Sequence, residues 1–283
     1  MTGEDPCDNK VKRMEDKSTS VYFIGAGPGD PELLTIKGKR IIETADIVIW
    51  ADSLVSPGIA GLARGDAEVY GSASMSLEEI VTIMVRAARE DKMVARVHTG
   101  DPSIFGAMLE QMAALEREGV GYSVVPGVSS LFAAAAALQT ELTAPEVAQT
   151  VIITRAAGRT PVPEPESLRA LAAHRTTLAL FLSAGMIEKA VADLIQGGYE
   201  SSTPAAIVYR ASWPDEKIVR GSLGEIAALS RQAGIANQAL ILVGQALDSA
   251  LKSADAQRSR LYDGSFAHGR RGKLPADERG GGL

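Results

Sequence analysis

Short apolar runs alternate with segments of helical spacing along most of the chain. Near residue 40, apolar and small residues fall at i, i+3, i+4 and i+7, at Gly38, Ile41, Ile42 and Ala45, which predicts one buried helical face. Strands alternating with such helices are typical of βα units in a mostly parallel sheet. The first half is therefore predicted to hold strands at residues 21–24, 47–50, 67–70, 93–97 and 122–125.

A second set of strands is predicted beyond residues 139–148, where the periodic pattern is lost. Pro214 and its polar neighbours predict a hairpin within this set, so the second sheet should be mixed. Residues 155–165 contain three prolines and are expected to form an exposed loop or lid. The predicted strands are residues 150–154, 177–182, 205–209, 217–220 and 239–243.

The pattern and a length of 283 residues predict two α/β domains with polar ends. Residues 1–18 are expected to be a disordered leader because they hold too little apolar surface to offset the entropy of ordering. The N-terminal α/β domain is expected at 19–140 and the C-terminal one at 149–250. Residues 251–283 form a net basic tail, expected to be partly disordered.

The amino-acid composition and net charge limit the classes of protein to which this chain can belong. No apolar run is long enough to span a membrane and no signal peptide is recognisable, which predicts a cytoplasmic protein. Cys7 is the only cysteine and there are three histidines, so neither a disulfide framework nor a metal site is expected. A net charge of -6 argues against a nucleic-acid partner. Any anionic ligand should therefore be small and held by a local group of Arg and Lys.

The turn after the strand at 93–97 is a candidate site. In open α/β sheets ligands bind beyond the carboxyl ends of the strands, where loops expose backbone N–H groups. Gly100 would let a ligand approach the main chain, and Asp101 could cap a helix opened by Pro102 and carrying Ile104, Met108 and Met112 on one face. An ordinary strand-to-helix turn explains the same residues.

A glycine loop follows the first strand, with the sequence Gly25-Ala26-Gly27-Pro28-Gly29-Asp30. The dinucleotide fingerprint G-x-G-x-x-G needs a third glycine where Asp30 stands. A carboxylate there would repel a pyrophosphate, which weakens the hypothesis of an NAD-dependent dehydrogenase. Asp30 before Pro31 is instead a good N-cap. His98 could act as a base, but a lone histidine at a strand end is more often structural.

Three motifs occurring in this order, residues 21–35, 94–106 and 125–130, resemble those of the tetrapyrrole (corrin and porphyrin) methyltransferases. The resemblance covers about residues 21–247. It implies two α/β domains, with a mostly parallel N-terminal sheet, a mixed C-terminal sheet and S-adenosylmethionine in a cleft between them, and it implies a homodimer. The positions it implies for cofactor contacts are Pro28, Thr99, Gly100, Asp101, Ile104, Ser129, Ser130, Leu182, Ala211 and Ala239.

Longer segments that are similar to one branch of this family imply a narrower activity. The branch transfers a methyl group to C11 of precorrin-4, giving precorrin-5, in cobalamin (vitamin B12) biosynthesis. The segments are residues 50–55, 96–102, 154–163, 209–220 and 261–269.

Methyl transfer to an electron-rich ring carbon needs mainly positioning and no protein nucleophile. Asp52 is a candidate for taking or relaying a proton, with a solvated or capping role as the alternative. The peripheral carboxylates of a tetrapyrrole need cationic partners, which Arg can grip with two bonds. Arg155, Arg159, Arg210, Lys217 and Arg220 are the candidates, and each could instead be a surface charge.

Several alternatives stay open at this point. One is another tetrapyrrole C-methyltransferase of the same family, including one acting on cobalt-precorrin-4. Another is an RNA or protein methyltransferase of the same fold, against which the acidic balance counts. Two further alternatives are an NAD-dependent dehydrogenase and a protein that binds a corrinoid without catalysing a reaction. For Leu182 and Ala239, core packing is the competing explanation.

Overall fold

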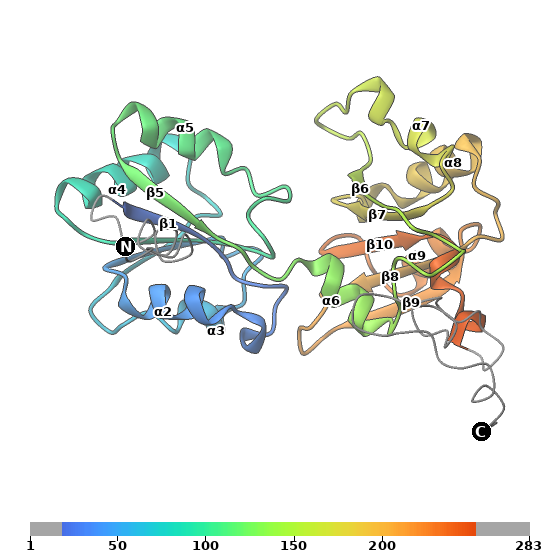
Figure 1. The fold of residues 1–283 in the computed structure, drawn as a ribbon, viewed down its shortest axis with the longest axis horizontal. Helices are drawn as coiled ribbons and strands as arrows, with labels where there is room; N and C mark the ends of the chain where they lie inside the picture. The colour runs from blue at the N-terminus through green and yellow to red at the C-terminus, as the bar shows by residue number, and fades with distance from the viewer. Residues whose placement is uncertain (1–18, 253–283) are drawn as a thin grey trace, which may run out of the picture. The chain divides into compact units, whose positions relative to one another are not determined.

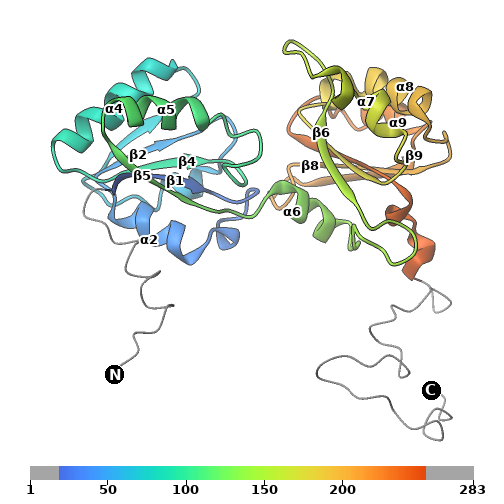
Figure 2. The ribbon, with the colours of Figure 1, turned by 45° about the horizontal axis from the view of Figure 1, so that its top comes forward.

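A computed structural model describes residues 19–252, which divide into two compact units. Unit 1 comprises residues 19–137 together with 210–217, and unit 2 comprises residues 138–209 and 218–252. Each unit is built around its own sheet (Figures 1 and 2). The predicted leader, with Cys7, and all but the first two residues of the predicted basic tail lie outside the described residues.

The sheet of unit 1 is entirely parallel, as predicted. Its strand order is β3-β2-β4-β1-β5, and all four neighbouring pairs run parallel. Consecutive parallel strands need crossover connections, which the helices supply. β4 is buried along its whole length because helices cover both faces of the sheet. The strands are β1 (Thr19–Gly25), β2 (Ile47–Trp50), β3 (Glu68–Gly71), β4 (Val94–His98) and β5 (Gly121–Val125).

Helices lie on both faces of this sheet (Figure 1). On one face, Ile41 and Ile42 of α2 (Ile36–Thr44) pack with Val48 and Ala95, beside α3 (Pro57–Ala60). On the other face α4 (Leu77–Arg89) and α5 (Leu109–Arg117) cover the sheet. The last helix of unit 1 is α6 (Ser130–Ala137).

Some helix starts carry side-chain caps, one of them the N-cap predicted at Asp30. Ser76 and Glu79 form a capping box at α4: the Ser76 hydroxyl accepts from the Glu79 N–H at 3.2 Å, and the Glu79 carboxylate accepts from the Ser76 N–H at 2.7 Å. Asp30 caps the short 3-10 helix η1 (Pro31–Leu33) by accepting from the Glu32 N–H at 2.9 Å. The buried face predicted for α2 is also present.

The helix predicted to open at Pro102 is wrong. Residues 101–108 form turns, and α5 begins only at Leu109. Phe105 and Ala107 have left-handed backbones, with φ of 53° and 48°, which no α-helix can accommodate. Asp101 does accept a local backbone N–H, that of Ser103, but as the start of a turn rather than of a helix.

The sheet of unit 2 is mixed, as predicted. Its order is β6-β7-β10-β8-β9; β6 and β7 are parallel, whereas β10 is antiparallel to both β7 and β8. β8 and β9 are neighbours joined by residues 210–216, the predicted hairpin connection. The strands are β6 (Val151–Arg155), β7 (Thr177–Phe181), β8 (Pro204–Tyr209), β9 (Lys217–Ser222) and β10 (Ala239–Val243).

Three helices share one core with this sheet. They are α7 (Leu168–Ala172), α8 (Ile187–Gly197) and α9 (Ile226–Gln232). Short 3-10 turns complete unit 2: η2 (Glu164–Glu166), η3 (Ala184–Met186), η4 (Gln245–Leu247) and η5 (Ser249–Lys252). No helix within residues 19–252 is both long and apolar enough to span a membrane.

Candidate functional site

Three loops meet at the carboxyl ends of β4, β1 and β5, the last three strands in the sheet order of unit 1. The loop after β1 and the loop after β4 exchange two backbone hydrogen bonds: the Gly100 N–H donates to the Gly27 carbonyl at 2.8 Å, and the Gly27 N–H donates to the Gly100 carbonyl at 3.2 Å. The site predicted at the turn after β4 therefore lies against the glycine loop. Loops in this position form the ligand sites of open α/β sheets.

The loop after β5 approaches the other two so closely that only glycine fits. A Cβ on Gly127 would lie 2.2 Å from the Gly100 carbonyl oxygen, and one on Gly25 would lie 2.6 Å from the same atom. Gly100 itself has φ +60°, in the left-handed region that glycine adopts without strain. This meeting point is consequently lined by main chain, with no side chain on these three residues to obstruct it. We call residues Gly25, Gly27, Gly100 and Gly127 the glycine cradle.

Asp101 braces the glycine cradle. One carboxylate oxygen accepts from the Gly127 N–H at 2.9 Å, and the other accepts from the N–H and the hydroxyl of Ser103. Partial burial alone would raise the pKa of Asp101, but the hydrogen bonds from Ser103 and Gly127 outweigh it and lower the pKa below its ordinary value. The carboxylate thus ties the loop after β4 to the loop after β5.

The other unit 1 positions implied for the cofactor lie along the same three loops. Pro28 is buried in the glycine loop, and Thr99 and Ile104 are partly buried in the loop after β4. Ser129 is buried, and its hydroxyl accepts from the Leu131 N–H at 3.3 Å. Ser130 is the first residue of α6. The structure therefore brings these positions together with the cradle.

The connection between β8 and β9 also belongs to unit 1. Ala211, one of the predicted cofactor positions, is buried there. Next to it, the Trp213 indole N–H donates to the Pro28 carbonyl at 2.8 Å. Trp213 stood in a segment that marks the family, but nothing in the sequence placed it against the glycine loop.

The two cofactor positions in unit 2 differ in burial. Leu182 follows β7, is 67 % exposed and has a left-handed backbone with φ 54°. Core packing, the competing explanation for Leu182, is therefore excluded. Ala239 begins β10 and is partly buried against the core of unit 2, so core packing does describe this residue.

Among the predicted substrate-binding cations, Arg155, Arg210 and Arg220 contact carbonyls, a carboxylate or an aromatic ring of the protein. The Arg155 guanidinium donates to the carbonyls of Ala156, Thr160 and Pro161, the last at 2.7 Å, and so braces the start of the predicted loop. The Arg220 guanidinium donates to the Leu138 carbonyl at 2.7 Å.

Arg210 is the third such cation. Its guanidinium pairs with Asp215 at 2.5 Å, and its Cζ lies 3.9 Å from the centre of the Trp213 ring. Arg159 and Lys217 are exposed.

Asp52, the candidate proton relay, is exposed just beyond β2. Its carboxylate accepts from the Ala73 N–H at 2.7 Å and packs over Gly71, where a Cβ would lie 2.8 Å away. The carboxylate thus holds the turn after β3, a structural contact related to the capping alternative, and the proton relay stays a prediction.

Two polar residues of β4, Arg96 and His98, are buried just before the loop that follows this strand, and sequence reasoning singled out only His98. Arg96 on β4 is 5 % exposed and donates to Gln111 at 3.0 Å and to the Ser72 hydroxyl at 3.2 Å. His98, two residues along the strand, is equally buried, and its Nε2 has no hydrogen-bond partner among residues 19–252. Burial and the neighbouring Arg96 lower the pKa of His98 to about 3, so the imidazole is neutral at physiological pH and is a poor base.

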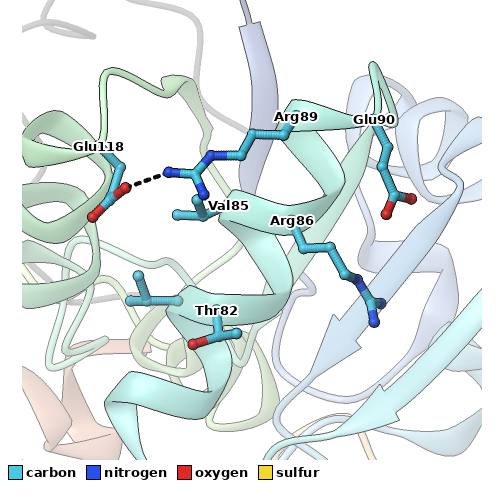
Figure 3. A pocket seen from close by; sticks show the side chains of 7 residues that line it. Thr82, Val85, Arg86, Arg89, Glu90 and Glu118 are labelled. Carbon is cyan, nitrogen blue, oxygen red and sulfur yellow. Dashed lines mark hydrogen bonds and ion pairs between the residues drawn. The ribbon is translucent and has the colours of Figure 1, made fainter.

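A hollow of about 400 Å³ lies elsewhere in unit 1, over α4 and the end of α5 (Figure 3). Arg89 and Glu118 form an ion pair of 2.8 Å across it. None of the predicted site residues lines this hollow.

Comparison with known proteins identifies the family. The family model described as Tetrapyrrole (Corrin/Porphyrin) Methylases matches residues 20–227. The chain belongs to the tetrapyrrole methylase family. This match confirms the resemblance drawn from the three sequence motifs. It excludes the hypothesis that the chain is an NAD-dependent dehydrogenase.

Individual tetrapyrrole methylases are similar over most of their length. A cobalt-precorrin-4 C(11)-methyltransferase of Methanocaldococcus jannaschii is 53% identical over 253 residues, covering 89% of this chain and 96% of that protein. A precorrin-4 C(11)-methyltransferase of Pseudomonas aeruginosa is 46% identical over 250 residues, covering 88% and 97%.

Solved structures of tetrapyrrole methylases share the fold. The X-ray structure of a cobalt-precorrin-4 methyltransferase matches with TM-score 0.79 and 53% identity, covering 81% of this chain and 95% of that one. The uroporphyrin-III C-methyltransferase of Thermus thermophilus, complexed with S-adenosylhomocysteine, matches with TM-score 0.68 and 32% identity, covering 80% and 98%. The predicted fold class, two α/β domains with a parallel and a mixed sheet, is confirmed.

Proposed function

We propose that this tetrapyrrole methylase transfers a methyl group from S-adenosylmethionine to C11 of precorrin-4, giving precorrin-5 in cobalamin biosynthesis. The observation that carries the proposal is the glycine cradle in unit 1, where three loops bring main-chain groups together without intervening side chains. Relatives named for methylation at C11 match along almost their whole length, which supports the narrower activity.

A second candidate substrate is the cobalt form of the same macrocycle. Two relatives named for cobalt-precorrin-4 are each 53% identical, whereas relatives named for precorrin-4 are 42 to 46% identical. Both candidates share the ring carbon and the methyl donor. They differ only in whether cobalt already occupies the ring.

The residues of the cradle fit the proposed donor. When bound, S-adenosylmethionine supplies an electrophilic methyl group on a positively charged sulfur. Carbonyl oxygens of residues 99–101 carry partial negative charge and suit a cation, while Ile104 offers an apolar wall. Thr99, Gly100 and Asp101 are proposed to hold the methionine part, and Ser129 and Ser130 the ribose or carboxylate. Pro28, Leu182, Ala211 and Ala239 are proposed to surround the adenosine.

The protein's contribution to rate is positioning. Holding an electron-rich ring carbon in line with a methyl group can supply about 7 to 11 kcal/mol of barrier reduction. A bound donor would supply the methyl carbon while sulfur keeps the electron pair of the broken bond, and the methylated ring would return to its former charge by releasing a proton to solvent. Five cations are proposed to bind peripheral carboxylates of the ring: Arg155, Arg159, Arg210, Lys217 and Arg220. Arg155, Arg210 and Arg220 would do so without giving up the contacts described above.

The test is transfer of labelled methyl to the ring. The full chain is incubated with ¹³C-methyl S-adenosylmethionine and either precorrin-4 or cobalt-precorrin-4, and the labelled carbon is located by NMR. Label at C11 of either substrate is expected, and the faster reaction identifies the preferred form. Label at another ring carbon would assign the chain to a different tetrapyrrole methylase, and binding of the macrocycle without transfer would indicate a corrinoid-binding protein.

We further propose a cytoplasmic homodimer, which the family resemblance implies. A single cysteine in 283 residues is consistent with a reducing compartment. Light scattering should give twice the chain mass of 29.7 kDa. A mass of one chain at micromolar concentration would refute the dimer.

A further inference from the structure

Residues 210–216 form a tightly braced turn within unit 1, which we call the tryptophan turn. Arg210 and Ser212 have left-handed backbones, with φ of 47° and 66°. Non-glycine residues adopt this conformation unfavourably and keep it only where surrounding contacts enforce it. Two such residues within three indicate that the shape of the turn is imposed for a purpose.

The contacts that impose this shape hold the Trp213 ring. The Arg210 guanidinium lies 3.9 Å from the ring centre, a cation–π contact, and pairs with Asp215 at 2.5 Å. The backbone N–H of Ser212 donates to the Glu216 carboxylate at 2.7 Å, and the backbone N–H of Trp213 donates to the Arg210 carbonyl at 2.9 Å. These contacts hold the indole in one orientation.

The fixed indole lies directly on the glycine loop. Its N–H donates to the Pro28 carbonyl at 2.8 Å, and the neighbouring Ser212 hydroxyl accepts from the Asp30 N–H at 3.0 Å. A Cβ on Gly29 would lie 2.1 Å from the indole Cδ1, so Gly29 is what allows the ring to reach the backbone. The loop is thus held by the tryptophan turn on one side and by Gly100 on the other.

We propose that Trp213 is a positioning residue for the methyl donor, acting through the Pro28 carbonyl. Pro28 is the residue between Gly29, beneath the indole, and Gly27, whose main chain pairs with Gly100 in the cradle. Releasing the carbonyl lets the Gly27–Gly100 pair shift, and the cradle loses its geometry. The inference rests on the proposed function, because it requires the donor to bind at the cradle.

The first test replaces the donor atom of the indole while keeping an aromatic ring. In the full chain, Trp213→Phe should weaken binding of S-adenosylhomocysteine, measured by calorimetry, about three- to tenfold, as expected for one lost hydrogen bond. The KM for S-adenosylmethionine should rise by a similar factor, with kcat at saturating donor nearly unchanged. A purely structural role would lower the melting temperature without moving KM and kcat apart.

Tyr199→Phe is the matched control. The Tyr199 hydroxyl also donates to a backbone carbonyl, that of Thr176, but it lies in the core of unit 2. This variant loses a comparable bond and some stability, yet its affinity for S-adenosylhomocysteine should equal that of the wild type. An equal loss of affinity in both variants would overturn the proposal.

Two further variants keep the proposal testable if Trp213→Phe folds poorly. Ser212→Ala removes the acceptor of the Asp30 N–H and leaves the indole in place, and Gly29→Ala pushes the indole away; both should weaken donor binding.

The outcomes separate the two hypotheses. Wild-type affinity in both Trp213→Phe and Ser212→Ala would overturn the positioning role while leaving the donor site intact. Failure of the wild-type chain to bind S-adenosylhomocysteine at all would instead refute the proposed function.

Discussion

Individual glycines decide whether the three loops of unit 1 can meet. Glycine occurs at 28 positions of this chain, and its positions differ in how much they depend on the missing side chain. At Gly127 a Cβ would collide with backbone, which cannot rotate away as a side chain can. At Gly65 a Cβ would meet nothing within 4 Å. The two positions therefore offer a direct comparison between a needed and an unneeded glycine.

Gly127→Ala should destabilise the protein and abolish donor binding, whereas Gly65→Ala should do neither. Overpacking of this kind costs about 1 to 3 kcal/mol or more, because the backbone of two loops must move apart. Urea unfolding and calorimetry with S-adenosylhomocysteine measure the two effects. Normal binding by Gly127→Ala would show that close approach of the loops is dispensable.

His98 should make the stability of the fold depend on pH. Its pKa is lowered to about 3 in the folded protein, against an ordinary value of about 6.5 in the unfolded chain. The unfolded state therefore binds more protons between these values, and the free energy of unfolding should fall by about 1.4 kcal/mol for each pH unit below 6.5.

His98→Gln removes this dependence. Its stability should change less than that of the wild type between pH 6.5 and 4, whereas His174→Gln, at an exposed position, should follow the wild-type curve. Chemical denaturation at several pH values gives the curves. Parallel curves for His98→Gln and the wild type would show that His98 is not held neutral by burial.

The spacing of apolar residues along the chain was sufficient to predict most of the strands and helices. All ten strands lie where the apolar runs placed them, because strands buried in a sheet need continuous or alternating apolar residues. The helix predicted after Pro102 failed since its pattern of Ile104, Met108 and Met112 ignored Phe105 and Ala107, whose left-handed backbones no periodicity reveals.

The candidate site was predictable only where a motif marked it. Gly100 and its neighbouring loop residues followed from the resemblance and from the strand ends, whereas the close approach of Gly25 and Gly127 to Gly100 did not. The contact of Trp213 with Pro28 did not, because it joins residues 185 apart in the chain and no local pattern encodes that pairing. Likewise the bonds of Arg155 to its own loop could not be told in advance from a substrate contact.

Arg155→Ala should loosen the loop that follows β6. The guanidinium donates to three loop carbonyls, so its loss should speed hydrogen exchange of residues 156–163 several-fold while the strands stay protected. Mass spectrometry after deuterium labelling measures this. Arg159→Ala, an exposed change in the same loop, is the control and should leave exchange unaltered; accelerated exchange in both variants would refute a specific bracing role.

On the scale of the whole molecule, sequence order and spatial units do not coincide. Residues 210–217 belong to unit 1 although β8 and β9, the strands they join, lie in the sheet of unit 2. Leu182 and Ala239, two positions that the resemblance implies for the donor, belong to unit 2. Binding should therefore respond to changes in unit 2 that leave the fold intact.

Leu182→Ala is such a change. The side chain is 67 % exposed, so truncation should alter the free energy of unfolding by less than about 0.5 kcal/mol. If Leu182 covers the adenosine, its truncation should weaken the binding of S-adenosylhomocysteine about five- to thirtyfold. Burial of a whole leucine side chain contributes about 1.5 to 3 kcal/mol, and the alanine keeps part of that contact. Ile36→Ala, at a 90 % exposed position outside the proposed site, should leave the affinity unchanged.

The most direct test of the central claim is a crystal structure of the full chain with S-adenosylhomocysteine. The account predicts ligand density against the main chain of Gly100 and Gly127, with the homocysteine part beside residues 99–101 and no side chain moved aside to admit it. Density bound elsewhere on the chain, with the glycine cradle free of ligand, would contradict it.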